Sequence, residues 1–340
     1  MKYYFLMVLL AAVMVSRAQT ATVYRVAFYN VENLYDIYDD PEKNDDEFLP
    51  HGIKGWNYTR YYQKLRHLYK TIAAFGEGSH LVAFGMCELE NNFVTRQLLE
   101  NTPLKKCGYR FIQYESPDRR GVDVALAYDP KVLTPLFSEP ITIRFPFDTL
   151  GKTRDILYVK VLLTAVDTLH LFVNHWPSRF GGLTATIPKR NFVASVLKQR
   201  CDSLFRISPQ AAIIIMGDLN DDPTDESVLI SLGADNHSLI NLMHPDNLKE
   251  KGGTLKHESV WNVFDQIIVS PALLQGHIKT SVLGGCAHIA ALPFLLCEDP
   301  KWPGTKLYRT YSGMQYLGGF ADHLPVYIDL KVRTHNRDVN

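Results

Sequence analysis

Apolar residues follow two patterns along this chain, and the patterns alternate from one end to the other. Short runs rich in Val, Ile, Leu, Phe and Tyr are typical of strands. Apolar residues that recur every three or four positions are typical of a helix with one buried face. The predicted strands cover residues 24–29, 80–86, 122–128, 156–164, 169–173, 211–216, 264–269 and 326–330, and a turn around Asp167 is predicted before the fifth.

Two helices are predicted between these strands, over residues 61–75 and 188–205. Arg60, Lys64 and His67 fall on the polar side of the first helix. This spacing predicts a basic face that is either solvated or turned towards an anionic ligand.

Strands interspersed with helices, without an internal repeat, predict an α/β sandwich rather than an all-α or all-β fold. By length alone, 340 residues suggest about two domains. No segment has the composition of a linker, so we predict one domain over residues 19–340. Residues 281–297 are apolar but too short and too interrupted by Gly and Pro to span a membrane.

The N-terminus resembles a secretory leader. Lys2 is the only early charge, residues 5–15 form an apolar stretch too short for a membrane span, and small residues follow at 16–18. We therefore predict a signal peptide at residues 1–18 and an exported protein, periplasmic or secreted, with no transmembrane segment after cleavage. A buried N-terminal helix or an uncleaved anchor is the alternative.

Composition narrows the classes of function. Apolar residues make up 46% of the chain and charged residues 21%, which predicts a large core and excludes disorder. The chain has 36 basic and 36 acidic residues, and removal of residues 1–18 takes away Lys2 and Arg17 and no acid, so the mature net charge is −2. Proteins that depend on affinity for the phosphate backbone usually carry a basic surplus. Tight nucleic-acid binding is therefore disfavoured, whereas action on phosphodiesters is not.

The five cysteines have separations that match no zinc site. Some of them can pair in an exported chain, but the odd number leaves at least one free. The apolar neighbours of Cys286 and His288 favour core packing there over metal binding.

Polar residues collect where several predicted strands end. Asn30 and Glu32 are two positions apart, so their side chains leave the same face of a strand, where an amide and a carboxylate can share a hard cation. An ordinary turn is the alternative. Glu88 ends a buried strand and needs either a metal or an arginine partner, because an unpaired buried carboxylate is costly. Glu90 is predicted to be an acid at a helix start.

Two further groups follow later strands. His175 precedes Arg179 in Asn-His-Trp-Pro-Ser-Arg; a histidine titrates near neutral pH, and an arginine can bind phosphate through two N–H groups. Gly217, predicted to let the backbone turn, introduces Asp218 and Asn220, which again share a face. The two acids that follow, at 221 and 222, are predicted to cap or form a turn.

The last polar residues lie in the final third of the chain. Asp265 follows Phe264, and Asp322 precedes His323. Asp265 is predicted to hold one ring nitrogen of His323 and to leave the other nitrogen for a reaction. A simple turn acid is the alternative for Asp265.

Taken together, these groups resemble the endonuclease/exonuclease/phosphatase superfamily, which includes pancreatic deoxyribonuclease, the apurinic-site endonucleases, neutral sphingomyelinases and inositol polyphosphate 5-phosphatases. The resemblance covers residues 23–332 and is strongest to exported bacterial members of unassigned substrate. The residues that carry it, in chain order, are Asn30, Glu88, His175, Asp218, Asn220, Asp265, Asp322 and His323, and the segments 30–36, 120–125, 174–179, 309–311 and 318–323 support it.

The resemblance implies a four-layer α/β sandwich, with two mostly antiparallel mixed sheets packed face to face and helices outside. It implies Mg²⁺, or Mn²⁺, as cofactor. Glu88 would be the main metal ligand, with help from Asn30 or Glu32 and from Asp322.

The resemblance also implies the catalytic roles. His323, paired with Asp265 or Asp322, would activate water or stabilise the phosphorane, and Asp218 is the competing general base. The groups that would hold the phosphate are Asn220, His175 and Arg179.

The predicted function is an exported, Mg²⁺-dependent phosphoesterase that cleaves phosphodiesters, as a nuclease does, or phosphomonoesters. Such esters repel hydroxide, and a cation with nearby donors offsets the charge in the transition state. The substrate is DNA, a lipid headgroup or a small metabolite, and no stable protein partner is implied. One alternative is a non-catalytic binding protein on the same scaffold, and a weaker one is a calcium-binding surface protein based on the acidic loop at 36–58.

Overall fold

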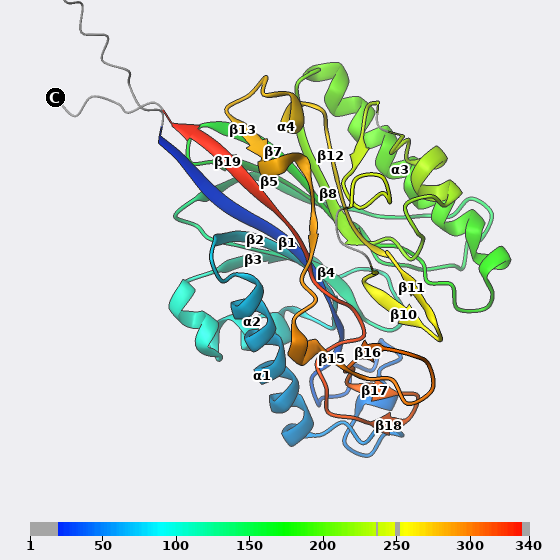
Figure 1. Ribbon diagram of the computed structural model, residues 1–340. Coiled ribbons are helices and arrows are strands. Elements are labelled where there is room, and N and C mark those ends of the chain that lie inside the picture. Colours follow the sequence, from blue (N-terminus) through cyan, green and yellow to red (C-terminus); the bar gives the residue numbers. More distant parts are fainter. Residues whose placement is uncertain (1–19, 236, 249–251, 335–340) are drawn as a thin grey trace, which may run out of the picture.

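Two β-sheets packed face to face form the centre of the computed structural model, which describes residues 20–235, 237–248 and 252–334 (Figure 1). The predicted signal peptide at 1–18 lies outside the described residues. The first sheet has the order β13 (Thr280–Val282), β19 (Val326–Thr334), β1 (Thr20–Leu34), β2 (His80–Leu89), β4 (Asp123–Tyr128) and β3 (Arg110–Gln113), and β14 (His288–Ile289) also pairs with β19.

The second sheet is built mainly from the middle of the chain. Its order is β5 (Leu133–Ile141), β6 (Ile156–Leu163), β7 (Asp167–His175), β8 (Ala212–Asp218), β12 (Asp265–Val269) and β9 (Ile240–Asn241). Each sheet contains one parallel pair, β1 with β2 and β7 with β8, and the other pairs are antiparallel. The predicted mixed, mostly antiparallel sheets are thus confirmed.

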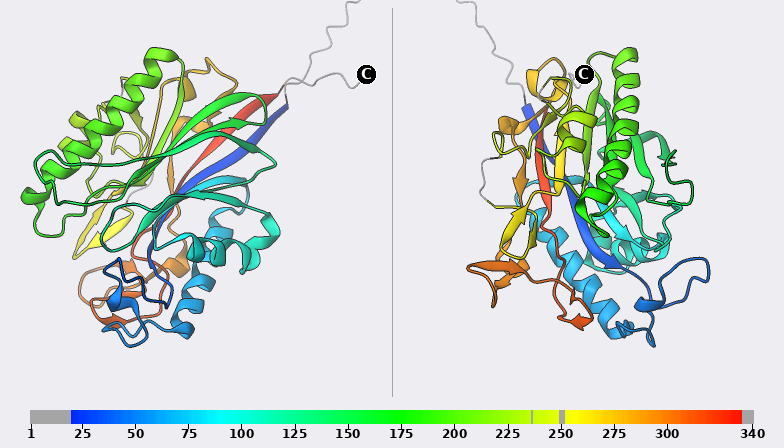
Figure 2. Two further views of the ribbon diagram at one scale, coloured as in Figure 1. Left: turned by 180° about the vertical axis from the view of Figure 1, so that it is seen from behind. Right: turned by 90° about the vertical axis from the view of Figure 1, so that its right-hand side faces the viewer.

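Helices cover the outer faces of the two sheets (Figure 2). α1 (Tyr58–Phe75) and α2 (Asn92–Glu100) share an apolar cluster with the first sheet, and α3 (Leu183–Ile207) shares another with the second sheet. Shorter helical segments are η1 (Asp46–Phe48), η2 (Pro103–Cys107), η3 (Ser227–Ser231), α4 (Ala272–Gln275), η4 (Leu283–Gly285) and η5 (Pro293–Leu295). The layers are therefore helix, sheet, sheet and helix, as predicted.

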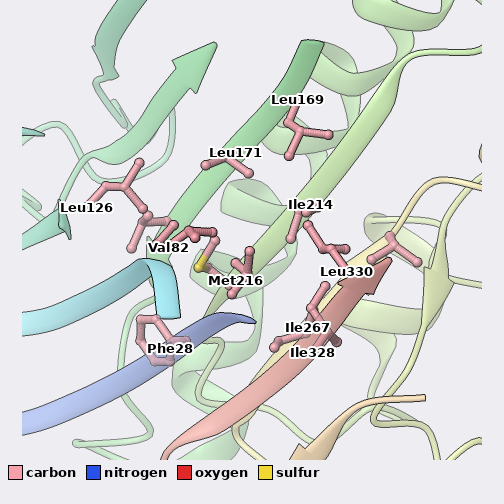
Figure 3. Close-up of a cluster of buried hydrophobic side chains, with 14 of the residues drawn as sticks. Phe28, Val82, Leu126, Leu169, Leu171, Ile214, Met216, Ile267, Ile328 and Leu330 are labelled. Atoms are coloured by element: carbon pink, nitrogen blue, oxygen red, sulfur yellow. The ribbon is translucent and has the colours of Figure 1, made fainter. Parts of the chain in front are cut away.

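β8 shows why a continuous apolar run fits this architecture. Ile214 and Met216 point into the core between the sheets (Figure 3), and Ile213 and Ile215 belong to the apolar cluster shared with α3. Successive side chains of a strand point to opposite faces, so a strand covered on both faces must be apolar at every position.

Three small hairpins lie together at one end of the sandwich (Figures 1 and 2). They are β10 (Leu255–His257) with β11 (Val260–Asn262), β15 (Leu296–Glu298) with β16 (Thr305–Leu307), and β17 (Tyr311–Ser312) with β18 (Gln315–Tyr316). Such short strands give little periodic signal, and none of these hairpins was predicted from the sequence.

Several local predictions were wrong. The turn before β7 lies at Thr164 and Ala165, both with positive φ, and Asp167 starts the strand. α3 begins at Leu183 rather than at residue 188. A helix start was predicted at Glu90, but α2 begins at Asn92 and its N-cap is Asn91.

Glu90 is not an acid at the start of α2. Its carboxylate accepts a hydrogen bond from the Asp36 backbone N–H at 2.6 Å, and burial raises its pKa to about 8. Glu90 therefore anchors the acidic loop to the end of β2.

All five cysteines, which lie in the described part of the chain, are free thiols. Among the described residues, none of the helices combines the length and the apolar content that a membrane crossing needs.

Candidate active site

Three strands of the second sheet have a polar residue at one shared edge: β7 ends at His175, β8 ends at Asp218 and β12 begins at Asp265. β7 and β8 run parallel, so His175 lies beside Asp218, and Asp265 of the antiparallel β12 lies on the other side of Asp218. Gly217 is extended rather than at a turn. A Cβ at Gly217 would clash with the backbone carbonyl oxygen of Asn174 in β7, so glycine is required for the close approach of the two strands.

Residues of the first sheet meet this row across the sandwich. Asn30 in β1 donates from Nδ2 to Asp218 Oδ2 at 3.0 Å and lies 3.5 Å from Glu88 Oε1. His323, in the segment that leads into β19, lies against Asp265 of β12. Both sheets therefore contribute to one site at the rim of the sandwich.

His323 is held by Asp265 as predicted. Its Nδ1 lies 2.6 Å from Asp265 Oδ2, and its Nε2 lies 3.8 Å from Asp218 Oδ2 and 3.9 Å from Asp322 Oδ1. Burial alone would lower the pKa of His323, but the carboxylates of Asp265 and Asp218 outweigh burial and raise it well above the ordinary value. The ring is therefore a strong proton acceptor that is fixed at one nitrogen.

Asp218 is nearly fully buried, and burial raises its pKa to about 7. Its Oδ1 accepts a hydrogen bond from the Asn220 backbone N–H at 2.9 Å, and its Oδ2 accepts one from Asn30. A carboxyl group with a pKa near neutral is suited to transfer protons.

His175 is a neutral ring in the same site. Burial lowers its pKa well below the ordinary value, and Arg154 and Arg120 act in the same direction. Its Nε2 lies 3.8 Å from both Glu88 Oε1 and Asp218 Oδ2. Its buried Nδ1 has no hydrogen-bond partner among the described residues.

Glu88 is presented by a bulge near the end of β2. The pairing with β4 skips Glu88, whose φ is 64°, a strained value for a residue with a side chain. Its Oε2 accepts a hydrogen bond from the Asn33 backbone N–H at 2.8 Å. Oε1 is therefore the oxygen left to face Asn30 and His175.

The donor set fits a divalent metal. Two groups of side chains place ligand atoms close enough to hold one ion, and both contain Asp218. One group adds Asp265 and His323, and the other adds His175 and Cys87. Burial raises the pKa of Cys87, which keeps it a thiol, so the oxygen and imidazole donors are the relevant ones.

The structure separates Glu32 from Asn30. The two were expected to share a strand face, but Glu32 has a φ of 52° in an irregular stretch of β1. Its carboxylate accepts hydrogen bonds from the backbone N–H groups of Thr310 at 2.7 Å and Tyr311 at 3.3 Å. Lys64 Nζ lies 3.7 Å from the same carboxylate.

Arg309 bridges the carboxylates of Asp322 and Glu32. Arg309 donates from a terminal nitrogen to Asp322 Oδ2 at 2.5 Å, and its Nε lies 3.6 Å from Glu32 Oε1. The two predicted metal ligands therefore belong to an ion-pair cluster made of Glu32, Lys64, Arg309 and Asp322, which we call the charge cluster.

At Lys64, the basic face predicted for α1 is neither exposed to solvent nor available to a ligand. Lys64 is buried, and its ammonium group donates to Thr310 Oγ1 at 2.6 Å and to the Phe320 carbonyl oxygen at 2.5 Å. His67 lies 2.8 Å from the carbonyl oxygen of Gly319. This side of α1 therefore anchors the segment that carries Arg309 and Asp322.

Arg179 is engaged by other groups. It donates to the carbonyl oxygen of Asn220 at 2.9 Å, to Asp221 at 3.0 Å and to Asp225 at 2.7 Å, and it lies over the ring of Phe264. Its position ties together the loops after β7 and β8.

The neighbours of Arg179 are also occupied. The side-chain amide of Asn220 donates to the Trp176 carbonyl oxygen at 3.0 Å. Asp221 pairs with Arg190 at 2.6 Å, and Asp222 accepts from the Val263 backbone N–H at 2.7 Å. These two acids therefore hold loops in place, in keeping with the predicted structural role.

Arg309 had no predicted role in the site, and Lys64 was predicted only as part of a basic face that is solvated or turned towards an anionic ligand. The sequence signal for Arg309 was the local motif Arg-Thr-Tyr at 309–311. The motif does not reveal the partner of Arg309, because Glu32 lies almost the whole chain away. Arg309 also lines two clefts. One of about 260 Å³ adjoins Asp322 and is lined further by Lys256, Lys301, Trp302 and Lys306, and one of about 190 Å³ adjoins Glu32 and is lined further by Lys54 and Tyr311.

Comparison with known proteins identifies the class of protein. Residues 25–332 match the model of the Endonuclease/Exonuclease/phosphatase family. The chain therefore belongs to this family, whose members hydrolyse phosphoric ester bonds, and the class of enzyme is the one predicted. No curated protein matches the sequence.

Solved structures share the fold. An endonuclease/exonuclease/phosphatase family protein from Bacteroides thetaiotaomicron is 14% identical with a TM-score of 0.58, over 93% of this chain and 100% of that one. A mannosyl-6-phosphatase from the same organism is 15% identical with a TM-score of 0.55, over 90% and 99%. D. rerio TDP2, complexed with a single-strand DNA product, is 16% identical with a TM-score of 0.57, over 91% and 98%.

Proposed function

We propose that this chain is a hydrolase of phosphate esters that works with a divalent metal, Mg²⁺ or Mn²⁺, held by Glu88. Asn30, the other expected ligand, instead turns its amide Nδ2 to Glu88 and Asp218, and its Oδ1 accepts a hydrogen bond from the Glu32 backbone N–H. The observation that carries the proposal is the row His323, Asp265 and Asp218, in which one histidine nitrogen is fixed at 2.6 Å and the other faces a buried carboxyl group. This arrangement supports proton transfer at a defined atom.

The residues of the site divide the chemistry between them. Asp265 orients His323, so Nε2 is the atom that exchanges a proton with the attacking water or with a phosphoryl oxygen. Asp218 is the second group able to transfer a proton, because its pKa is about 7. A bound divalent ion would offset the negative charge of the phosphoryl group.

Other side chains are placed to bind the phosphate. The neutral His175 can donate a hydrogen bond without adding charge, and its Nε2 faces both Glu88 and Asp218. Arg309 is a second candidate, because its side chain is 40% exposed and borders both clefts. Arg179 and Asn220 support the loops around this centre through the contacts described above.

We propose a small phosphate ester as the substrate class, in preference to duplex DNA or a lipid headgroup. The clefts beside Arg309 hold about 260 and 190 Å³, and lysines and Trp302 line the larger one. The formal net charge of the chain is zero, so a large basic surface for a nucleic-acid backbone is not favoured. Related folds include both a mannosyl-6-phosphatase and a protein bound to single-strand DNA, so both classes belong in the test.

A substrate panel tests this proposal. The purified chain is assayed with Mg²⁺, with Mn²⁺ and with EDTA on bis-p-nitrophenyl phosphate, sugar and inositol phosphates, sphingomyelin and plasmid DNA. We expect turnover of at least one small ester that EDTA abolishes and that added metal restores. Failure of every substrate with both metals would refute the enzymatic proposal, and hydrolysis of plasmid DNA or sphingomyelin alone would refute the substrate class.

We also propose export directed by residues 1–18, because a short apolar stretch follows Lys2 and small residues follow the stretch. Expression of the full chain in a bacterial host, followed by fractionation and N-terminal sequencing, is the test. We expect a mature chain that begins at Gln19 in the periplasm or medium. Recovery of the chain with Met1 intact in the cytoplasm would contradict the proposal.

A further inference from the structure

We propose that the cleft of about 260 Å³ beside Arg309 binds the leaving group of the substrate, and that this group is a compact sugar or polyol with a second phosphate, held by Lys301 and Lys306. The inference rests on the proposed function, because it names the substrate of the same site. Water attacks the reacting phosphorus, the ester P–O bond breaks, and the leaving oxygen takes up a proton. The products are inorganic phosphate and a sugar or polyol monophosphate.

The first observation is the position of the cleft. Asp322 lines it, and Asp322 Oδ1 lies 3.9 Å from Nε2 of His323, the nitrogen left for the reaction. Arg309 lines the same part of the wall, since it contacts Asp322 Oδ2 at 2.5 Å. A phosphoryl group at His323 therefore lies next to the cleft, and the rest of the ester can extend into it.

The second observation is charge that the protein leaves uncompensated in the cleft wall. Lys256 pairs with Asp299 at 2.8 Å, and Arg309 belongs to the charge cluster. Among the described residues, Lys301 and Lys306 form no ion pair, and the remaining acid of the wall lies at the exposed turn between β10 and β11. A phosphate group of the substrate would supply the missing counter-charge, because ammonium groups form strong hydrogen bonds to phosphate oxygens.

The third observation is that the turn between β15 and β16 is fixed against β10. Lys256 donates to Asp299 Oδ2 at 2.8 Å and to the Thr305 carbonyl oxygen at 3.0 Å, and the side chains of the ion pair are only 3% and 5% exposed. Asp299 Oδ1 accepts the backbone N–H groups of Lys301 at 3.0 Å and Trp302 at 3.2 Å. The turn that carries the cation and the indole ring is thus preorganised, which lowers the entropic cost of binding.

The size and lining of the cleft favour a compact ligand with both apolar and polar faces. Its volume is below the range of about 300–1,000 Å³ that is typical of pockets for drug-sized ligands. Trp302 contributes an apolar ring face, with Lys301 Nζ 5.4 Å from the ring centroid, and Ser312 contributes a hydroxyl group. A sugar or polyol complements this wall through its C–H faces and its hydroxyl groups.

A matched pair of substrates is the direct test. Glucose 6-phosphate and glucose 1,6-bisphosphate share the sugar and one phosphate and differ in the second phosphate. Steady-state phosphate release with Mg²⁺ gives kcat/KM for each, and the product of the bisphosphate is identified. The test variant is Lys301→Met/Lys306→Met, and the control is Lys105→Met/Lys106→Met, which removes two exposed lysines of η2 that line neither cleft.

We expect kcat/KM of the wild type to be at least about tenfold higher for the bisphosphate, mainly through a lower KM, because the second phosphate gains charge-assisted hydrogen bonds. We expect the ratio of the two substrates to fall to about one in Lys301→Met/Lys306→Met and to be retained in the control. Circular dichroism checks folding, and Lys306→Met alone replaces the double variant if the latter does not fold.

A ratio near one in the wild type would overturn the inference, and so would an unchanged ratio in a folded variant without the two lysines. Better turnover of 6-phosphogluconate, which has a carboxylate in place of the second phosphate, would overturn the assignment of phosphate. Hydrolysis of a single-stranded oligonucleotide without either glucose phosphate would overturn the compact leaving group. Each of these results leaves the proposed function intact if bis-p-nitrophenyl phosphate or the oligonucleotide is hydrolysed with metal.

Binding separates the inference from failure of the proposed function. Isothermal titration calorimetry with both glucose phosphates is carried out on the full chain in EDTA, so it requires no turnover. We expect a Kd about tenfold lower for the bisphosphate in the wild type and equal Kd values in Lys301→Met/Lys306→Met. Equal Kd values in the wild type, or no binding of the bisphosphate, would overturn the inference whether or not any ester is hydrolysed.

Discussion

The site contains two neighbouring groups of charged residues, which differ in the cationic partners that balance their buried carboxylates. In the first group, Asp218 and Asp265 face His323 and lie at the ends of paired strands. In the second, the charge cluster, Glu32 and Asp322 face Lys64 and Arg309.

The two groups illustrate how counter-charge decides the role of a buried carboxylate. Asp218 has a pKa of about 7, because burial penalises its charge and its histidine partner compensates only in part. Asp322 has a lowered pKa, because Arg309 and His323 outweigh the effect of burial. Glu32 in the same cluster has a raised pKa, because burial outweighs the effect of Lys64 and Arg309. Asp218 can therefore exchange a proton or bind a cation, whereas Asp322 is held by a permanent cation and positions it.

The largest expected effect is on the first group. We expect His323→Ala to lower kcat by about 10³-fold with the best substrate of the panel, because it removes the proton-transferring ring. His277→Ala, which changes an exposed histidine, is the control and should retain full activity. Activity of His323→Ala within tenfold of the wild type would mean that the reaction does not pass through this ring.

The second effect is on the stability of the charge cluster. We expect Glu32→Ala to lower the free energy of unfolding by about 3 kcal/mol, because it leaves the buried Lys64 ammonium group without a carboxylate. Urea denaturation followed by circular dichroism is the measurement.

Asp202→Ala is the matched control for Glu32→Ala. Its ion pair with Lys198 is exposed, so the expected change is at most about 0.5 kcal/mol. If Glu32→Ala and Asp202→Ala lowered the free energy of unfolding equally, the ion pairs of the charge cluster would contribute no more to stability than an exposed pair.

A third effect separates orientation from binding. We expect Asp265→Asn to lower kcat by about 10²-fold with little change in KM, because the ring of His323 loses the carboxylate that fixes its Nδ1. Asp329→Asn, which removes the charge of a β19 carboxylate paired with Arg25, is the control. A large rise in KM without loss of kcat would instead indicate that Asp265 contributes to substrate binding.

The smallest effect concerns Arg179. Since its guanidinium group is held by Asp221 and Asp225, we expect Arg179→Met to change kcat/KM by less than about tenfold and to lower thermal stability instead. Steady-state kinetics with thermal denaturation distinguishes the two roles. A loss of kcat/KM above a hundredfold at unchanged stability would restore Arg179 as a phosphate-binding residue.

Much of the fold could be predicted because its signals are local. The Ile-rich run of β8 and the spacing of α1 report burial directly, and Asp265 and His323 stand beside apolar strands. The short hairpins at 255–262 and 296–316 could not be predicted, since strands of two or three residues show no period.

The site was predicted unevenly for the same reason. The residues at regular strand ends, His175, Asp218 and Asp265, are adjacent because the ladders β7–β8 and β8–β12 align them. Glu32 was expected to follow the strand alternation, but its positive φ and the irregular pairing after Asn30 redirect its side chain.

The sequence by itself determined the alternation of strands and helices, the layered class of fold and the identity of the polar groups at strand ends, because burial pattern and residue type are properties of neighbouring positions. The tertiary structure alone decided which carboxylates are compensated. Lys64 and Arg309 lie far from Glu32 in the chain, yet packing of α1 and of the 309–322 segment brings both cations within 4 Å of it. Charge compensation depends on distance in space, and only the folded chain sets that distance.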